Sequence, residues 1–320
     1  MKLEDIGFYT LSDERAKNVG VLKPLSRCEL ILTDRCNFSC PYCRGVKDIY
    51  RGDIDFDLAT QIIDLWCKDG LKNIRFSGGE PTLYSGLDLL VKRSVIGGIE
   101  RIALSTNGSA PLGYYEYLIK IGVNDFSISL DACCSSTGKT MTGVENAWEI
   151  SVKTIEAISK LTYVTIGLVL TENNINEVVD TIRFVDKLGV SDIRIISSAQ
   201  MNGLVGGLDK IELNILNKYP ILKYRIGNYL NGKNVRGLSL YDCPTCFLML
   251  DDMAVMAGKH FPCIIYMREG GDPVGNVGVD MRKERVNWVT SRITQLDEIC
   301  RKNCLDVCIA YNNKVYDFFV

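Results

Sequence analysis

The sequence predicts an α/β protein, a (βα)6 partial TIM barrel followed by a small cysteine-rich C-terminal domain. From residue 27 to about residue 197, short β-rich runs alternate with amphipathic helical stretches, and six cysteines follow after residue 240. Alternation of this kind is the signature of parallel βα units. Six strands can be counted in this stretch, fewer than the eight of a closed barrel, so we expect a partial barrel.

Each strand candidate is apolar enough to be buried on both faces of a parallel sheet. The six candidates are Cys28–Leu32, Asn73–Phe76, Arg101–Leu104, Asp125–Leu130, Tyr163–Leu170 and Asp192–Ile196. Between them, Asp57–Lys68 carries its apolar residues on one side and Ile175–Leu188 follows a polar segment, which predicts outer helices. One further helix is expected near Lys210–Asn217.

The chain is expected to divide into four parts. Residues 1–25 form a lead segment, 26–220 the barrel, 221–240 a linker, and 241–320 a second domain that binds a metal cluster. The residues before the first strand are too few for a separate folded domain.

Composition and charge exclude several classes of protein. The chain has 320 residues, of which 47% are hydrophobic and 24% charged, a profile typical of a globular protein with a sizeable core. Its 37 basic and 39 acidic residues give a net charge of −2, too weak a field to hold nucleic acid or an anionic membrane. The first residues lack the apolar core of a signal peptide, and the apolar run Tyr163–Leu170 is too short to span a bilayer. We therefore expect a cytoplasmic protein that binds neither nucleic acid nor membrane.

Thirteen cysteines are many for a chain in a reducing compartment, where thiols serve metals or redox reactions rather than disulfides. Nine of them fall into three clusters: Cys36, Cys40 and Cys43; Cys243, Cys246 and Cys263; and Cys300, Cys304 and Cys308. We consider all nine to be candidate metal ligands.

The first cluster lies in the loop after the first strand, at the edge where parallel sheets bind their ligands. Its spacing brings three thiolates together, whereas a closed zinc or iron–sulfur site needs four ligands. One coordination position is left open, where an iron could bind a small molecule through an amine and a carboxylate. The alternative is a zinc site completed by another cysteine.

Polar residues follow three more strands in the same way. Gly78 and Gly79 come after the second strand and allow a close backbone approach to a ligand. The segments Ser105–Gly108 and Ser129–Asp131 follow the third and fourth strands with side chains suited to bind an amino-acid head group and a ribose. We expect these residues to converge on one site. The alternative is purely local, with the glycines and Asn107 making turns and Asp131 capping the next segment.

Together these residues resemble the radical S-adenosylmethionine (SAM) superfamily, whose signature is this cysteine spacing with an aromatic residue before the third cysteine, here Tyr42. The stretches Leu32–Phe38, Ile74–Pro81, Thr106–Gly108 and Ser129–Asp131 look like the branch that contains the GTP cyclase of molybdenum-cofactor synthesis and the peptide-modifying maturases. The resemblance covers roughly residues 27–200.

The resemblance implies a 4Fe–4S cluster on Cys36, Cys40 and Cys43, with SAM chelating the fourth iron. Reductive cleavage of SAM would then release a 5′-deoxyadenosyl radical that abstracts a substrate hydrogen. Further residues are implied as SAM contacts: Gly78 and Gly79 at the amino group, Tyr42 near the adenine through its backbone, Glu80 as a buttress of its loop, and Ser105, Asn107, Ser129, Asp131 and Arg194 at the carboxylate or ribose.

The C-terminal cysteines resemble the SPASM or shorter twitch extension, which holds auxiliary iron–sulfur clusters. Cys246, Gly258 and Cys263 have the spacing of its first half, and turn residues between them predict a hairpin. A full SPASM domain needs seven or eight ligands and only six cysteines are present, so we expect one auxiliary 4Fe–4S cluster. Its ligands are drawn from Cys243, Cys246, Cys263, Cys300, Cys304 and Cys308, of which the last three share a face if their segment is helical.

Two observations qualify this reading of the C-terminal segment. The spacing of Cys243 and Cys246 is by itself typical of a zinc knuckle, which leaves a zinc site as the alternative. The cyclase family has asparagine and arginine after its second cysteine here, and this chain has Phe247 and Leu248, which argues against GTP cyclisation.

The candidate catalytic residues are Cys133, Cys134 and Asp131, just beyond the fourth strand. Either thiol could return a hydrogen atom to a substrate radical; the alternative is that both are incidental. The one histidine, His260, lies in the predicted C-terminal hairpin, so we do not expect a mechanism based on histidine as the general acid or base.

The function predicted first is modification of a ribosomally synthesised peptide by crosslinking, thioether formation, epimerisation or dehydrogenation. Its partners would be a flavodoxin- or ferredoxin-type one-electron reductant and a separate leader-peptide-binding protein, since no winged-helix module precedes the barrel. The second hypothesis is a radical SAM dehydrogenase or rearranging enzyme acting on a sugar, nucleoside or amino acid. The third is a non-catalytic zinc-binding interaction protein.

Overall fold

The computed structural model describes residues 13–45, 51–198, 207–233 and 235–319. Residues 1–12 of the predicted lead segment, 1–25, lie outside the described residues. The contacts divide the chain into two compact units. The first unit comprises residues 1–35, 44–102 and 236–320, and the second comprises residues 36–43 and 103–235.

The sheet of the first unit combines N-terminal and C-terminal strands in the order β2-β1-β7-β8-β9. Its strands are β1 (Arg27–Ile31), β2 (Asn73–Ser77), β7 (Asp252–Met256), β8 (Lys259–Phe261) and β9 (Gly275–Asn276). The central strand β1 runs parallel to both neighbours, so Leu30 lies opposite Phe76 on one side and Val255 on the other. Strand β8 runs antiparallel to both of its neighbours, β7 and β9.

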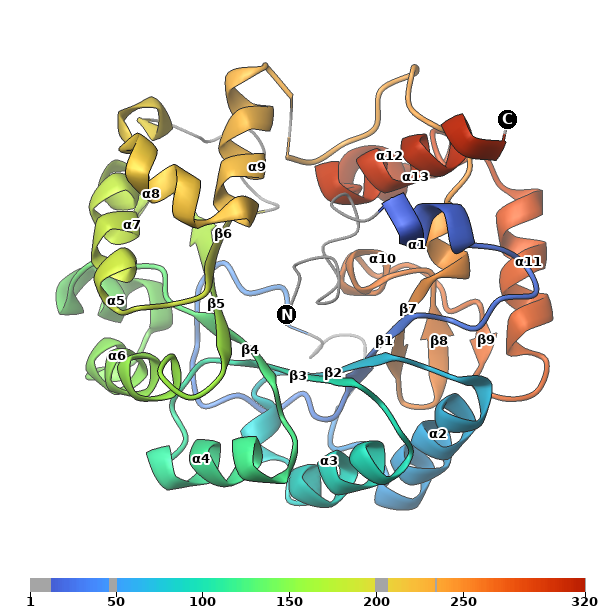
Figure 1. Ribbon diagram of the computed structural model, residues 1–320, viewed down its shortest axis with the longest axis horizontal. Helices are drawn as coiled ribbons and strands as arrows, with labels where there is room; N and C mark the ends of the chain where they lie inside the picture. Colours follow the sequence, from blue (N-terminus) through green and yellow to red (C-terminus); the bar gives the residue numbers. More distant parts are fainter. Residues whose placement is uncertain (1–12, 46–50, 199–206, 234, 320) are drawn as a thin grey trace. The chain divides into compact units, whose positions relative to one another are not determined.

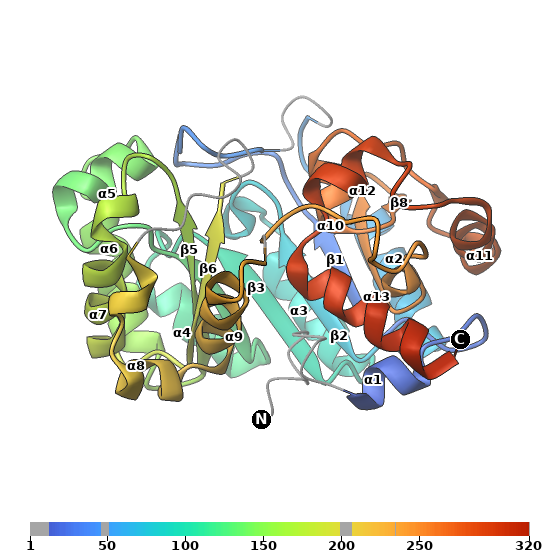
Figure 2. The ribbon, with the colours of Figure 1, turned by 90° about the horizontal axis from the view of Figure 1, so that it is seen from above.

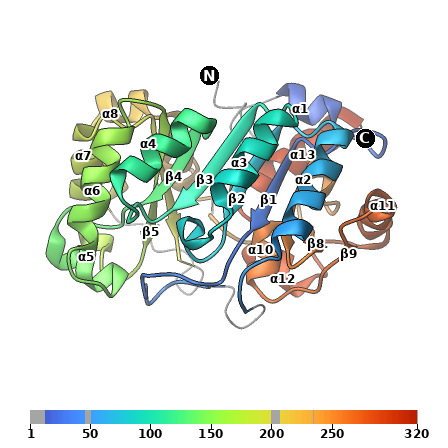
Figure 3. The same ribbon diagram turned by 90° about the horizontal axis from the view of Figure 1, so that it is seen from below.

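Helices of the first unit cover this sheet, and Figure 3 shows α2 and α3 side by side along β1 and β2. Helix α2 starts where Asp55 accepts a hydrogen bond from Leu58 N, and it ends at Gly70, whose φ of 89° suits a left-handed cap. The helices are α1 (Asp13–Asn18), α2 (Phe56–Asp69), η3 (Pro81–Leu83), α3 (Leu87–Ile96), η7 (Phe247–Leu250), α10 (Ile264–Arg268), α11 (Met281–Ser291), α12 (Glu298–Asn303) and α13 (Asp306–Phe319).

The predicted C-terminal hairpin is present as β7 and β8. Met256 pairs with Lys259, which leaves Ala257 and Gly258 as a two-residue turn, both with positive φ. Helix α13 lies along α1 in Figure 2, so the two described ends of this unit pack together.

The second unit holds parallel strands in the order β3-β4-β5-β6, sheathed by helices (Figure 1). The strands are β3 (Arg101–Thr106, which enters this unit at Ala103), β4 (Asp125–Ser129), β5 (Tyr163–Leu170) and β6 (Asp192–Ser197). The helices are α4 (Leu112–Ile121), α5 (Ser135–Thr142), α6 (Ala147–Ile158), η4 (Ile175–Glu177), α7 (Val178–Lys187), η6 (Leu208–Lys210), α8 (Leu213–Lys218) and α9 (Pro220–Leu230).

All six predicted strands are present, each within two residues of its predicted bounds. The structure adds two features: α9 occupies much of the predicted linker 221–240, and β7 joins the C-terminal segment to β1 as a parallel neighbour. Within the described residues, none of the helices combines the length and the apolar character needed to cross a bilayer.

Candidate active site

The loop that carries the first three cysteines belongs to the second unit, and a turn holds two of them together. Cys43 N donates to Cys40 O over 3.0 Å, and Ser39 N donates to Thr142 O over 2.9 Å, which ties the loop to the end of α5. Burial, together with the charges of Asp131 and Cys43, raises the pKa of Cys40 to about 12. A positive centre at this loop would therefore be needed to hold the thiolate at neutral pH.

The number of these thiols suits a 4Fe–4S cluster with an open position. In the part of the chain that the structure describes, Cys36, Cys40 and Cys43 do not form a group whose sulfur atoms all lie within 4.8 Å of one another. A closed zinc site needs four ligands, and a 4Fe–4S cluster has four irons that each bind one ligand. Three thiols therefore fit a 4Fe–4S cluster with one iron left free of protein ligands.

Asn107 supports this loop directly. Its Nδ2 donates to Asn37 Oδ1 over 2.9 Å and lies 4.0 Å from Cys36 Sγ, while its Oδ1 accepts from Ser109 N. The predicted local role as a turn residue is therefore combined with a contact to the loop. Ser105 lies two residues earlier, on β3, and is half-buried.

A buried tyrosine–aspartate pair fixes the far end of the loop, and sequence reasoning did not find it. Tyr42 OH donates to Asp131 Oδ2, and Val169 N donates to Asp131 Oδ1 over 2.6 Å. Burial raises the pKa of Asp131 to about 6, and the bonds from Tyr42 and Val169 oppose that rise. Both oxygens of Asp131 thus have a protein partner, which joins the cysteine loop to the ends of β4 and β5.

Arg194 reaches across a neighbouring strand. Its Nη2 donates to Ser127 Oγ over 3.0 Å, passing over Gly167, where an added Cβ would lie 3.4 Å from the guanidinium. Gly167 therefore leaves room for the arginine along β5. Ser129, at the end of β4, is exposed.

In the first unit, the glycines after β2 pack tightly against residues 33–35. A Cβ on Gly79 would lie 2.3 Å from Arg35 O, and one on Gly78 would lie 2.5 Å from Thr33 O. Gly79 N and Glu80 N donate to Thr33 O and Arg35 O over 2.8 and 2.7 Å. Only glycine allows this approach, so the packing of residues 33–35 accounts for both glycines.

Glu80 makes hydrogen bonds within its own loop. It is 1% exposed, and Oε1 accepts from both Thr82 N and Thr82 Oγ1, over 3.1 and 2.6 Å. The carboxylate therefore starts the short helix η3.

Five of the six C-terminal cysteines gather in the first unit. They interact electrostatically across η7, α10, α12 and α13: Cys246, Cys263, Cys300, Cys304 and Cys308. Burial and the neighbouring Cys308 raise the pKa of Cys246 to about 11, and burial with Cys308 and Cys246 raises that of Cys263 further. Buried thiols that oppose each other's ionisation are suited to a multivalent cationic centre, which removes their protons. This donor set fits the four thiolates of a 4Fe–4S cluster.

Cys243 stands apart from this group. Its sulfur lies 3.3 Å from Thr245 O, and after burial the charges that raise its pKa are Asp242 and Asp317 rather than other cysteines. Nor do the last three cysteines share one continuous helix: α12 ends at Asn303, and α13 begins at Asp306 after Leu305 bridges to Arg236. Cys304 and Cys308 nevertheless contact each other across this break.

A buried arginine lies beside the C-terminal cysteines. Arg285 is 2% exposed and donates to the carbonyls of Met249, Asp252 and Phe261, so it joins η7, β7 and β8. The neighbouring imidazole of His260 hydrogen-bonds Glu284, with 2.9 Å between Nε2 and Oε2. Burial holds the pKa of His260 below its usual value. The histidine is therefore a neutral structural residue of the hairpin.

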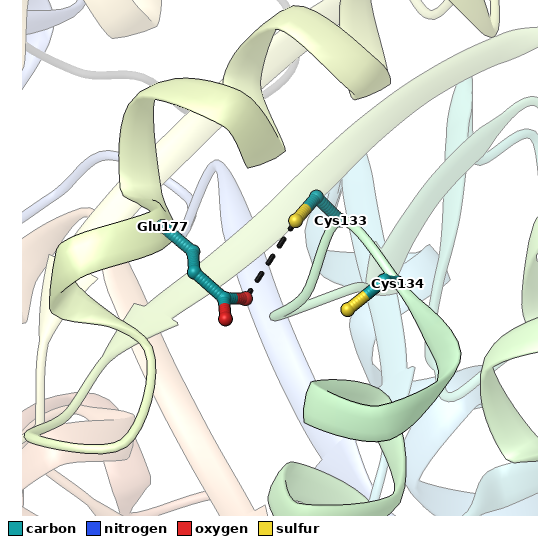
Figure 4. Close-up of side chains that lie close together, drawn as sticks. All are labelled: Cys133, Cys134 and Glu177. Carbon is teal, nitrogen blue, oxygen red and sulfur yellow. Dashed lines mark hydrogen bonds between the residues drawn. The ribbon is translucent and has the colours of Figure 1, made fainter.

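The candidate catalytic thiols lie directly after Asp131. Cys133 and Cys134 are half-buried and stand beside Glu177, as Figure 4 shows.

Comparison with known proteins agrees with this geometry. Residues 30–185 match the family model of the radical SAM superfamily. A stretch of 120 residues is 36% identical to the GTP 3′,8-cyclase of Staphylococcus aureus strain JH9 and covers 34% of this chain and 35% of that protein. The chain thus matches about a third of the length of these curated relatives.

Two groups of solved structures share the fold. Streptococcus suis SuiB bound to precursor peptide SuiA is similar over 88% of this chain and 67% of its own, with 16% identity and a TM-score of 0.59. Native anSMEcpe with bound AdoMet is similar over 92% of this chain and 95% of its own, with 16% identity and a TM-score of 0.62. The predicted fold class, a (βα)6 partial TIM barrel with a cysteine-rich C-terminal part, is therefore confirmed. The radical SAM superfamily uses a 4Fe–4S cluster and SAM, as the resemblance implied.

Proposed function

We propose that the chain is a radical SAM enzyme in which Cys36, Cys40 and Cys43 hold the SAM-binding 4Fe–4S cluster. The observation that carries this proposal is the three-cysteine loop after β1, which offers three thiols and whose Cys36 lies beside the Asn107 amide. When bound and reduced, the cluster supplies an electron that cleaves SAM to a 5′-deoxyadenosyl radical, which abstracts a hydrogen from the substrate.

The protein's own part in this reaction is positioning. The bonds from Tyr42 to Asp131 and from Asn107 to Asn37 hold the cysteine loop at two points, which fixes the direction of its thiols. Gly78, Gly79, Ser105, Ser129 and Arg194 stay proposed SAM contacts. Asp131 already bonds Tyr42 and Val169, so a role at the SAM ribose would require it to share an oxygen.

We also propose one auxiliary 4Fe–4S cluster on the C-terminal cysteines. Four of Cys246, Cys263, Cys300, Cys304 and Cys308 would be its ligands, and the position of Cys243 beside Thr245 favours leaving that residue out. This site would accept an electron from the substrate or bind the substrate itself.

The substrate proposed first is a ribosomally synthesised peptide. Support comes from the neighbours in fold: SuiB is described with its precursor peptide, and anSMEcpe with the Kp18Cys peptide. A one-electron reductant and a leader-binding protein would be the partners, in the cytoplasm. The second candidate is a small molecule, and Phe247 and Leu248 after Cys246 argue against GTP despite the cyclase similarity.

The test is formation of 5′-deoxyadenosine. Anaerobically reconstituted protein should release it from SAM in the presence of dithionite, and the Cys36→Ala/Cys40→Ala/Cys43→Ala variant should release none. Product formation by that variant, or none by the wild type with full iron content, would contradict the proposal. Incubation with a candidate precursor peptide and mass spectrometry then separates peptide modification from the small-molecule alternative.

A further inference from the structure

Two cysteines and a glutamate form a compact group in the second unit. Cys133 and Cys134 follow β4, and Glu177 ends η4 beyond β5. In the described ranges, this is the one group of three or more His, Cys, Asp or Glu side chains whose ligand atoms all lie within 4.8 Å of one another. Figure 4 shows both sulfur atoms directed toward the carboxylate.

The separation of the donor atoms fits a single tetrahedral ion. Cys133 Sγ donates to Glu177 Oε2 over 3.6 Å. Zinc binds thiolate sulfur at about 2.3 Å and carboxylate oxygen at about 2.0 Å, and tetrahedral angles then place the two donor atoms about 3.5 Å apart. The pair therefore already has the spacing that a bound ion needs.

Surrounding hydrogen bonds hold the donors in place. Trp148 Nε1 donates to Ala132 O over 2.9 Å, just before the two cysteines. Asn174 Nδ2 donates to Asp131 O and Val169 O, each over 2.8 Å, and so joins the ends of β4 and β5. This fixes the backbone on which the thiols and the glutamate stand.

The glutamate itself is oriented by a threonine. Thr137 Oγ1 donates to Glu177 Oε1 over 2.9 Å, which leaves Oε2 directed toward Cys133. Partners of this kind are typical of ligating carboxylates, whose outer contacts set the direction of the metal-binding oxygen.

The hydrogen bonds of the two thiols also suit a cation. Cys134 Sγ lies 3.3 Å from Ser136 Oγ and 3.6 Å from Thr137 Oγ1 at the start of α5. Without a cation, the Cys133 proton lies between its sulfur and the carboxylate. A divalent cation would displace that proton and offset the charge of two thiolates and one carboxylate.

We propose that Cys133, Cys134 and Glu177 bind one soft or borderline divalent cation such as zinc. Two sulfur donors select zinc over magnesium or calcium. The fourth position is open to water, to the Thr137 hydroxyl, or to a donor atom of a substrate. This site goes beyond the proposed function, because none of its ligands belongs to either proposed iron–sulfur cluster.

The experiment uses the iron-loaded protein. We measure zinc retained per chain after equilibration with a competing chelator, and the zinc K-edge X-ray absorption, which iron does not obscure. The wild type should hold about one zinc with two sulfur ligands near about 2.3 Å and the remaining ligands oxygen or nitrogen near about 2.0 Å. Cys133→Ser and Glu177→Gln should lose most of this zinc, and Thr137→Val should weaken its affinity by about tenfold or more.

The matched control is Cys67→Ser, a half-buried cysteine on α2 in the first unit, which should keep the wild-type zinc. Iron content should be unchanged in every variant, which shows that each has folded and separates failure here from failure of the proposed function. Zinc retained undiminished by Cys133→Ser and Glu177→Gln, or a zinc bound by four sulfurs, would overturn the site. In that case the two thiols remain candidates only for hydrogen-atom transfer.

Discussion

The two cysteine-rich regions differ in how much of a metal site the protein itself completes. The loop of Cys36, Cys40 and Cys43 offers three thiols, one of them exposed, and its other contacts come from neutral or hydrogen-bonding groups such as the Asn107 amide. The C-terminal region brings five thiols together across four helical segments. Three ligands leave a coordination position for a reactant, whereas a full set encloses the cluster. Under the proposed function, the same residue type would serve the cleavage of SAM in one region and electron transfer or substrate binding in the other.

The largest effect expected is loss of the reaction on removal of the loop thiols. The Cys36→Ala/Cys40→Ala/Cys43→Ala variant should lose SAM cleavage completely yet keep the iron of the C-terminal region. The reason is that each region uses its own thiolates. Product analysis by chromatography and an iron assay on the same sample measure both quantities. Loss of all iron would show instead that the two regions depend on each other.

Removal of C-terminal ligands should stop turnover without removing the loop cluster. Cys246→Ala/Cys263→Ala should lose about four irons per chain and should no longer convert substrate. The matched control is Cys243→Ala in the same segment, which should keep its iron, because that thiol lies beside Thr245 and not among the other cysteines. Equal iron loss in the control would place Cys243 among the ligands of the C-terminal cluster and contradict its separation from the other five cysteines.

A smaller effect should follow from breaking the Tyr42–Asp131 bond. The pKa of Asp131 is raised to about 6, above its ordinary value of 3.8, so the folded state favours the protonated form. The free energy of unfolding should therefore fall as the pH rises from about 4 to about 6, by about 3 kcal/mol for this group alone. Tyr42→Phe removes a hydrogen bond that lowers this pKa, so in the variant the free energy of unfolding should keep falling to higher pH. The variant should therefore be destabilised by about 1–2 kcal/mol more at pH 7.5 than at pH 5.

Urea unfolding at pH 5 and pH 7.5 measures this difference. Tyr84→Phe is the control, because the Tyr84 hydroxyl donates to the neutral carbonyl of Ile54 over 3.2 Å. Its destabilisation should be the same at both pH values. A pH-independent effect of Tyr42→Phe would show that Asp131 does not titrate in this range.

The smallest effect concerns the electronic setting of the loop. Asn107→Leu removes the amide near Cys36 Sγ, a hydrogen bond worth about 1 kcal/mol. Because this bond stabilises the more negative, reduced cluster, its loss should lower the midpoint potential of the one-electron couple by about 40 mV. A redox titration followed by electron paramagnetic resonance measures this, with the C-terminal cluster as internal reference. A shift of both clusters, or of neither, would contradict the contact.

Local patterns predicted the parallel strands well and the long-range arrangement poorly. Apolar runs such as Tyr163–Leu170 and the polar residues that follow them are visible in the sequence because burial and strand ends are local properties. The pairing of β7 with β1 cannot be predicted locally, because the short apolar run Met253–Met256 carries no information about which strand it pairs with. Helix α9 was also missed, because its apolar residues lack a strong helical period.

At the site, spacing predicted the ligand types but not their neighbours. The three-cysteine loop is a local motif, whereas the approach of Glu177 to Cys133 joins residues 44 positions apart. The separation of Cys243 from the other C-terminal cysteines likewise depends on how η7 and α13 pack. The predicted domain boundaries at residues 25, 220 and 240 stay predictions.

The most direct test of two distinct cluster sites is the iron and sulfide content of three proteins after anaerobic reconstitution. The account predicts about eight irons per wild-type chain and about four in each of the Cys36→Ala/Cys40→Ala/Cys43→Ala and Cys246→Ala/Cys263→Ala variants. About four irons in the wild type, together with one zinc bound by the C-terminal cysteines, would contradict the auxiliary cluster. Absence of iron from the wild type would contradict the enzyme altogether.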